Sequence, residues 1–220
     1  MDTTILREGG ALTGRTIAIL METDYVEPEI DYYRMRFAEE GARVEFLTRL
    51  WGQDSITFVG HEHHLPFTVD GDLELVDDER LAGYDALIVP SGMVSDRLRY
   101  AESPGGTAPA VDLLRRAFAN PAVLKGIICH GLWLVAPIAD VVAGRAVTCH
   151  NNLISDARNM GAQYVDQDVV VSADLVTARS ADHCHLFART MIDLLAARTA
   201  GRAMRWWRSS VTNQGASHVR

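Results

Sequence analysis

The stretch VLKGIICHGLWLV, residues 123–135, places a cysteine where one type of secondary structure gives way to another. The run that ends at Cys129 is mostly apolar and contains β-branched residues, which favours a buried strand. The segment HGLWLVAPIADVV, residues 130–142, predicts a helix that opens at the Cys-His-Gly turn. A sharp strand-to-helix turn holds a side chain outward, as in a nucleophile elbow. The stretch therefore indicates an α/β fold and a candidate nucleophile.

Two interpretations of Cys129 follow from its position. A thiol at this turn faces helix N-terminal amides, whose partial positive charge lowers a thiol pKa and favours thiolate. In open parallel sheets, functional sites lie at the carboxyl ends of strands, and Cys129 falls at such an end. The alternative is a buried structural cysteine, the commoner role of this residue. The turn favours catalysis.

Strands and helices alternate on both sides of this stretch. Strands are predicted in TIAIL (16–20), ARVEFLTR (42–49), YDALIVPSG (84–92), RAVTCHN (145–151) and QDVVVSADLVTAR (167–179), and helices in EIDYYRMRFAEEG (29–41), APAVDLLRRAFAN (108–120) and HLFARTMIDLLAAR (185–198). This alternation is typical of a mainly parallel sheet covered by helices on both faces.

The composition is that of a globular protein. Of 220 residues, 48% are hydrophobic and 23% charged, which suits one α/β domain. We assign residues 16–197 to that domain, residues 1–15 to an N-terminal extension and residues 198–220 to a basic tail. The tail has five arginines and the pair Trp206-Trp207, so it is either a frayed terminus or a docking segment.

Charge and hydropathy exclude several classes of partner. The net charge of −8 argues against broad binding to nucleic acid or anionic membranes. No apolar run approaches the roughly 20 residues of a membrane span. The N-terminal residues MDTTILREGGALTGR lack the pattern of a signal peptide, so we expect a cytoplasmic protein.

Several ordered segments resemble the ThiJ/PfpI superfamily of cysteine enzymes. The matching stretches are IICHGLWLV (127–135), YVEPEIDYYRMRFAEEGARV (25–44), TVDGDLELVDDERLAGYDALIVPSG (68–92) and VTCHNNLISDARNMGAQYVDQDVVVSADLVTARS (147–180). The resemblance covers about residues 15–196 and combines PfpI-like with deglycase-branch features. It implies a flavodoxin-like sandwich of helices around the sheet, related to class I glutamine amidotransferases. It also implies a homo-oligomer (dimer, trimer or hexamer) that needs no cofactor.

The resemblance assigns the nucleophile and its oxyanion donors. Cys129 matches the family nucleophile, and the backbone amides of Gly92 and His130 match the oxyanion donors. The family turn is usually Gly-Gly, whereas this chain has Ser91-Gly92, and serine resists strained backbone that glycine accepts. Met93 and Trp133 are further pocket candidates.

His130 matches the histidine that follows the nucleophile in the PfpI-like branch. In that branch an acid from a neighbouring subunit often orients the histidine, and Asp96 falls on the acidic position. The resemblance therefore implies a Cys129–His130–Asp96 triad completed by oligomerisation, with His130 moving protons near neutral pH. The alternative role for Asp96 is a helix N-cap.

The family also places an acid beside the thiol, where it accepts a hydrogen bond or shuttles a proton. We choose Glu27, because it immediately precedes the helix-starting Pro28, and keep Glu29 as the fallback. The alternative is that both are first-turn acids that complement the helix dipole.

His150 resembles a site histidine of the deglycase branch, and a second imidazole suits proton transfer at a carbonyl carbon. The alternative is a strand-end histidine bonded to backbone. His183 falls on a turn near the site and is either a pocket residue or a helix N-terminal residue without function.

Each of the three cysteines precedes a histidine, at positions 129, 149 and 184. Cys and His suit zinc. However, no CxxC or HxxxH spacing appears, so we predict no metal site, and we interpret His61-Glu62-His63-His64 as solvated. An odd cysteine count in a reducing compartment argues against disulfides.

These features predict a cysteine hydrolase, hydratase or lyase acting on a small electrophilic carbon. The resemblance suggests 2-oxoaldehyde hydration (glyoxalase or deglycase activity), amide or peptide hydrolysis, or isocyanide hydration. One rival is a redox sensor or holding chaperone, because a reactive thiol beside an acid also oxidises readily. The other is a specialised biosynthetic lyase or isocyanide hydratase.

Overall fold

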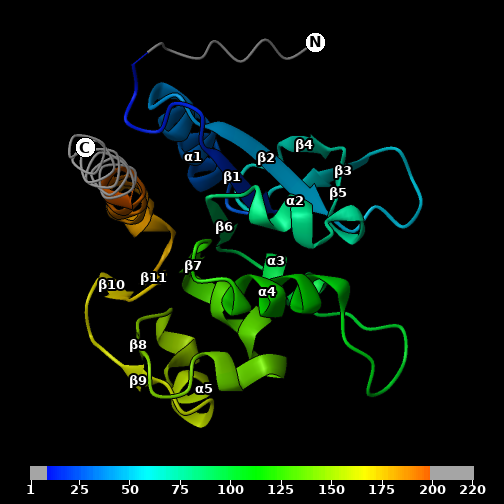
Figure 1. Cartoon of the computed structure of the whole chain (residues 1–220). Coiled ribbons are helices and arrows are strands. Elements are labelled where there is room, and N and C mark those ends of the chain that lie inside the picture. Colours follow the sequence, from blue (N-terminus) through cyan, green and yellow to red (C-terminus); the bar gives the residue numbers. More distant parts are fainter. Residues whose placement is uncertain (1–8, 199–220) are drawn as a thin grey trace, which may run out of the picture.

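The computed structural model describes residues 9–198, and its centre is a seven-stranded sheet in the order β10-β11-β7-β6-β1-β2-β5 (Figure 1). The strands are β1 (Thr16–Leu20), β2 (Arg43–Thr48), β5 (Gly71–Asp72), β6 (Ala86–Val89), β7 (Leu124–Ile128), β10 (Val169–Ser172) and β11 (Leu175–Ala178). Neighbours run parallel except for the antiparallel pair β10 and β11. The flavodoxin-like α/β prediction is confirmed.

Helices and two small sheets surround this sheet. The α-helices are α1 (Glu27–Glu39), α2 (Asp78–Ala82), α3 (Val94–Leu98), α4 (Pro109–Ala119) and α5 (Ile154–Asn159), and residues 184–198 are also helical. The 3₁₀ helices are η1 (Leu73–Leu75), η2 (Cys129–Val141), η3 (Asn151–Leu153) and η4 (Ala181–His183). β3 (Ile56–Val59) pairs with β4 (Pro66–Val69), and β8 (Ala146–Val147) pairs with β9 (Gln163–Tyr164).

The central strands are buried on both faces, which explains their continuous apolar sequences. Every residue of β6 and β7 is buried, as are four of the five in β1. On one face, α1 and the helix 184–198 lie side by side, where the rings of Tyr33 and Phe187 are 5.8 Å apart (Figure 1). The parallel pairing of β1, β6 and β7 brings the carboxyl ends of these strands to one edge of the sheet. That edge carries the candidate site.

The predicted helix after Cys129 is present but winds differently from an α-helix. Residues Cys129–Val141 form a 3₁₀ helix, which is interrupted at Ile138 with φ −128° and ψ 41°. Pro137 precedes the break. Proline has no amide hydrogen and its ring clashes with the preceding turn, so a regular α-helix cannot continue through this position.

The described residues that precede β1 pack against the domain. Residues 9–15 of the predicted N-terminal extension pack on the domain, because Leu12 is fully buried and its amide donates to the Glu40 carbonyl at 2.8 Å. The tail with Trp206-Trp207 lies outside the described residues. Within residues 9–198, no helix has the length and apolarity needed to cross a membrane.

Candidate active site

Cys129 sits at the carboxyl end of β7 in a backbone conformation that non-glycine residues rarely adopt. Its φ is +59°, and the side chain is 7% exposed. Such a conformation costs about 1–3 kcal/mol and persists only when its surroundings enforce it. Gly131 contributes to that enforcement: a Cβ there would lie 2.7 Å from the Val89 carbonyl oxygen, so only glycine lets the turn approach β6 this closely.

The Cys129 thiol is surrounded by three backbone amides and one carboxyl group. Burial, and after it the charge of Glu29, raise the pKa of this thiol, which is about 11. The amides of His130, Ala181 and Gly92 act in the opposite direction, but they do not offset burial. The expectation that the helix N-terminus yields a thiol of lowered pKa is therefore wrong, because desolvation outweighs the amide dipoles.

The turn after β6 provides the second wall of the site. The left-handed residue of this turn is Gly92, with φ +80°, and a Cβ there would lie 2.2 Å from the Asp24 carbonyl oxygen. Ser91 is not left-handed, so serine is tolerated where the family usually has glycine. Met93 follows as the half-buried N-cap of α3.

Glu29 is the acid that lies beside the thiol. Its side chain is 1% exposed, and it accepts hydrogen bonds from the Ser91 hydroxyl and from the Ser91 amide at 3.1 Å. Burial raises the pKa of this carboxyl to about 8, while Tyr33 and the Ser91 amide lower it. Glu29 is therefore mostly protonated at neutral pH and can donate a proton.

The choice of Glu27 as the site acid is corrected by the structure. The Glu27 carboxylate accepts hydrogen bonds from the amides of Glu62 at 2.9 Å, His63 at 2.8 Å and Leu65 at 3.4 Å. Burial alone raises its pKa, but these amides outweigh burial and hold the pKa at about 2. Glu27 thus anchors the loop between β3 and β4. Side chains two positions apart on a helix point in nearly opposite directions, so only one of the two acids faces Cys129.

His130 forms a hydrogen bond with the candidate nucleophile. Its Nδ1 atom lies 3.3 Å from Cys129 Sγ, and its carbonyl accepts the Ser95 hydroxyl at 2.7 Å. Burial lowers the pKa of His130, and the neighbouring His150 lowers it further. The imidazole is therefore neutral at neutral pH and can accept the thiol proton.

Two aromatic neighbours orient the His130 ring. The centroid of the His150 ring lies 4.5 Å away with an interplanar angle of 30°, and Trp133 packs edge-on at 5.5 Å. His150 Nδ1 accepts the Asn152 amide at 3.3 Å, which caps η3. His150 thus joins His130 at the site and also serves as a helix cap.

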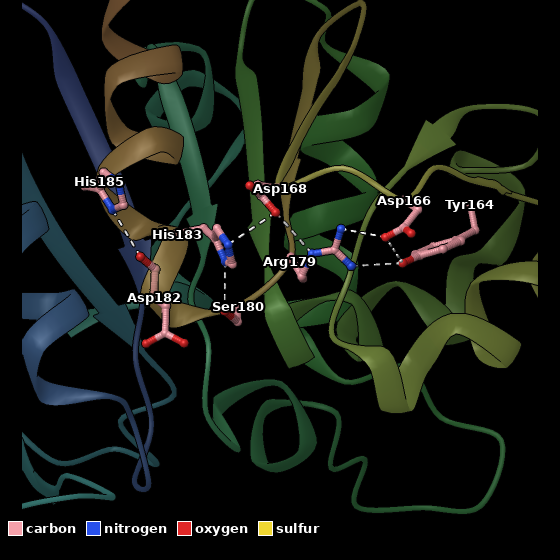
Figure 2. A network of polar contacts seen from close by, with 8 residues as sticks. All are labelled: Tyr164, Asp166, Asp168, Arg179, Ser180, Asp182, His183 and His185. Carbon is pink, nitrogen blue, oxygen red and sulfur yellow. Dashed lines mark hydrogen bonds and ion pairs between the residues drawn. The ribbon is translucent and has the colours of Figure 1, made fainter.

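Two other predicted residues do not join Cys129 directly. Asp96 is exposed in the first turn of α3, whose N-cap is Met93, so the alternative role of Asp96 as the cap is wrong. The ring of His183 bonds to Ser180 and Asp168, in a polar network that Figure 2 shows. No contact between Asp96 and His130 is recorded among residues 9–198.

The other cysteines stay protonated. Burial raises the pKa of Cys149 to about 12 and that of Cys184 to about 11, and all three thiols are free. Within the described part of the chain, no three His, Cys, Asp or Glu side chains are grouped as a metal ion would require.

Sequence reasoning missed two contributors to the site: the Ser91–Glu29 hydrogen bonds and the Ala181 amide. Tyr33, a fully buried core residue, influences Glu29. One signal in the sequence could have favoured Glu29. It lies four residues before Tyr33, on the helix stripe that continues to Phe37 and faces the sheet. The Ala181 amide carries no sequence signal, because any residue but proline supplies one.

Comparison with known proteins agrees with this architecture. The sequence pattern of the DJ-1/PfpI family matches residues 15–194. The chain belongs to the DJ-1/PfpI family. The ThiJ/PfpI resemblance of the sequence is thereby confirmed.

Relatives of this DJ-1/PfpI chain include named enzymes. It is 32% identical over 184 residues to Protein/nucleic acid deglycase 2 of Escherichia coli K12, covering 83% of this chain and 99% of that protein. It is 34% identical over 121 residues to YraA of Bacillus subtilis, whose name assigns it provisionally to the cysteine proteases. That match covers 54% of this chain and 66% of YraA.

Solved DJ-1/PfpI structures share the fold. A ThiJ/PfpI domain protein from Brachyspira murdochii superposes with a TM-score of 0.70 at 18% identity, covering 84% of this chain and 98% of the other. Schizosaccharomyces pombe DJ-1 gives a TM-score of 0.69 at 16% identity, covering 81% of this chain and 90% of the other. At such identities the likeness concerns the fold alone.

Proposed function

We propose that this DJ-1/PfpI protein is a cysteine-dependent enzyme that acts on small reactive carbonyl compounds, with glyoxalase or deglycase chemistry. One observation carries the proposal: Cys129 is held on a strained turn between a neutral imidazole, His130, and a protonated carboxyl group, Glu29. A base and an acid on either side of a thiol suit addition to a carbonyl group. The deglycase named among the relatives supports the same class.

In the first step, the Cys129 sulfur attacks the aldehyde carbon as its proton passes to His130 Nδ1. A carbon–sulfur bond forms and the carbonyl π pair moves to oxygen. The amides of Gly92 and His130, which face the sulfur, hold the developing oxyanion. Glu29 protonates this oxygen, and the product is a hemithioacetal.

For a 2-oxoaldehyde, a proton then leaves the former aldehyde carbon and another is delivered to the neighbouring carbon, while the hydroxyl proton of the hemithioacetal passes to the ketone oxygen. This converts the hemithioacetal into a 2-hydroxy thioester with no external oxidant. Water hydrolyses the thioester, which releases a 2-hydroxy acid and the thiol. The imidazoles of His130 and His150, whose ring centroids lie 4.5 Å apart, are suited to carry these protons, because an imidazole can both accept and return a proton.

The test is turnover of methylglyoxal to lactate by the purified protein, beside Cys129→Ala and beside a chromogenic peptide amide as the rival substrate. Lactate formation that is lost in the alanine variant supports the proposal. If only the amide is cleaved, the same residues serve a hydrolase. If neither substrate is turned over, the enzymatic interpretation is wrong.

Redox sensing is the less favoured candidate. A sensor thiol needs thiolate character to react with peroxide, whereas burial raises the pKa of Cys129 to about 11. The base at 3.3 Å is a group that turnover requires, because it takes the thiol proton during attack.

We further propose that Asp96 acts in a homo-oligomer. It is exposed, and the adjacent Ser95 bonds to the His130 carbonyl, so Asp96 lies at the rim of the site. A rim carboxylate could reach the outer nitrogen of the His130 of a second copy and stabilise the imidazolium that forms during attack.

A further inference from the structure

A polar network fastens the segment before the last helix to the loop before β10 (Figure 2). Asp168 Oδ1 lies 3.3 Å from His183 Nε2 and also 3.3 Å from Arg179 Nε. The other ring nitrogen of His183, Nδ1, lies 2.9 Å from the Ser180 hydroxyl. The imidazole is thus held at both nitrogens, which fixes its orientation.

Arg179 ties the same two segments together more broadly. Its guanidinium contacts Asp166 at 2.7 Å and the Tyr164 hydroxyl at 3.2 Å, and its amide donates to the Asp168 carbonyl at 3.0 Å. Because these bonds hold the loop at residues 164–168, Asp168 is a fixed anchor for His183.

Ser180 uses its hydroxyl in an unusual way for a helix N-cap. An N-cap serine ordinarily accepts a hydrogen bond from an amide of the first helical turn. Ser180 is the N-cap of η4 but makes no such bond, and its hydroxyl pairs with the His183 ring instead. The Ser180 hydroxyl therefore holds the imidazole and does not cap the helix.

The turn that this network holds is part of the candidate active site. Ala181 directly follows Ser180, and hydrogen bonding from its amide lowers the pKa of the Cys129 thiol. A donor stabilises a developing charge only while it is kept in place, because reorienting it during reaction costs the energy that it would supply.

We propose that Asp168, His183 and Ser180 form a positioning relay that holds the Ala181 amide against the Cys129 sulfur. The inference rests on the proposed role of Cys129 as nucleophile. In this relay His183 does not touch substrate and acts through Ala181.

The test is the rate at which iodoacetamide alkylates Cys129 between pH 6 and pH 11, read by mass spectrometry of the Cys129 peptide. In His183→Ala, the thiol pKa rises by about 0.5–1 unit and alkylation at pH 8 slows about 3- to 10-fold. Ser180→Ala shifts the profile in the same direction. His185→Ala is the matched control, because that ring bonds to the Asp182 carbonyl at 3.1 Å and has no hydrogen bond to Asp168, His183 or Ser180 within residues 9–198; its profile stays at wild type.

Asp168→Asn separates positioning from simple electrostatics. Removing a negative charge would by itself lower the thiol pKa, whereas loss of the relay raises it. A raised pKa in this variant supports the relay, and a lowered or unchanged one overturns it, as does a wild-type profile in folded His183→Ala. Alkylation requires no substrate, so the relay can be tested apart from turnover. If the protein does not turn over methylglyoxal but the thiol pKa shifts as expected, the proposed function is wrong and the relay is supported.

Discussion

The Sγ atom of Cys129 and the Nδ1 atom of His130 lie 3.3 Å apart, although the two residues are neighbours in the chain. Adjacent side chains in a strand point to opposite faces, so regular backbone would separate them. The positive φ of Cys129 brings them together. The strained turn thus places the His130 imidazole, a base, within hydrogen-bond distance of the thiol.

Replacing this base is expected to slow turnover. In His130→Ala the thiol, whose pKa is about 11, has no acceptor for its proton. We expect kcat for methylglyoxal to fall about 10²-fold, the usual worth of a general base. Steady-state kinetics check this, and a kcat within threefold of wild type would show that another group takes the proton.

The activity of the wild-type protein should depend on pH in a defined way. Protonated Glu29 is required, and the pKa of this carboxyl is about 8, so activity falls as the pH rises above 8. His130 must be neutral, and its pKa is lowered, so the acid limb lies below the ordinary histidine range. A profile of kcat/KM against pH shows both limbs. An alkaline limb that persists in Glu29→Gln would assign it to another group.

Glu29 should also make folding stability depend on pH. Its carboxyl has a pKa of about 8 when folded, against 4.5 for the ordinary group. The unfolded state therefore ionises first, and stability is lost as the pH rises from about 4.5 to 8, by about 1.4 kcal/mol per pH unit. Glu29→Gln removes this loss. Urea unfolding at pH 5 and pH 8 should show a variant that gains on wild type only at the higher pH.

Asp96 offers a prediction about the assembly. If it orients His130 of a second copy, Asp96→Asn lowers kcat about tenfold or more while the oligomeric state by light scattering is unchanged. The nearby Arg97→Gln, which removes an exposed contact with Asp24, is the control. A monomeric wild-type protein that turns over methylglyoxal would contradict the shared triad.

The sequence predicts the fold because fold depends on patterns repeated along the chain. The apolar runs at β1, β6 and β7 and the alternating helices needed no long-range information. In the sequence, only Pro137 indicates the 3₁₀ helix after Cys129, and the effect of this proline depends on how the segment packs.

The site was predicted less completely, since it depends on which neighbours each side chain meets. Glu27 and Glu29 are both buried first-turn acids, and the difference between them arises from loop amides at residues 62–65, more than 30 positions away. The role of His183 depends on Asp168, which reaches it only through the pairing of β10 with β11.

The central claim is most directly tested by comparing Glu29→Gln with Glu27→Gln in lactate formation from methylglyoxal at pH 7. Both variants remove one carboxyl group from the first turn of α1. We predict that Glu29→Gln loses activity about 10²-fold while remaining folded, because Glu29 protonates the adduct. Glu27→Gln should keep kcat within about threefold and lose about 1–2 kcal/mol of stability through its loop amides. Loss of turnover in Glu27→Gln, with Glu29→Gln active, would contradict the account.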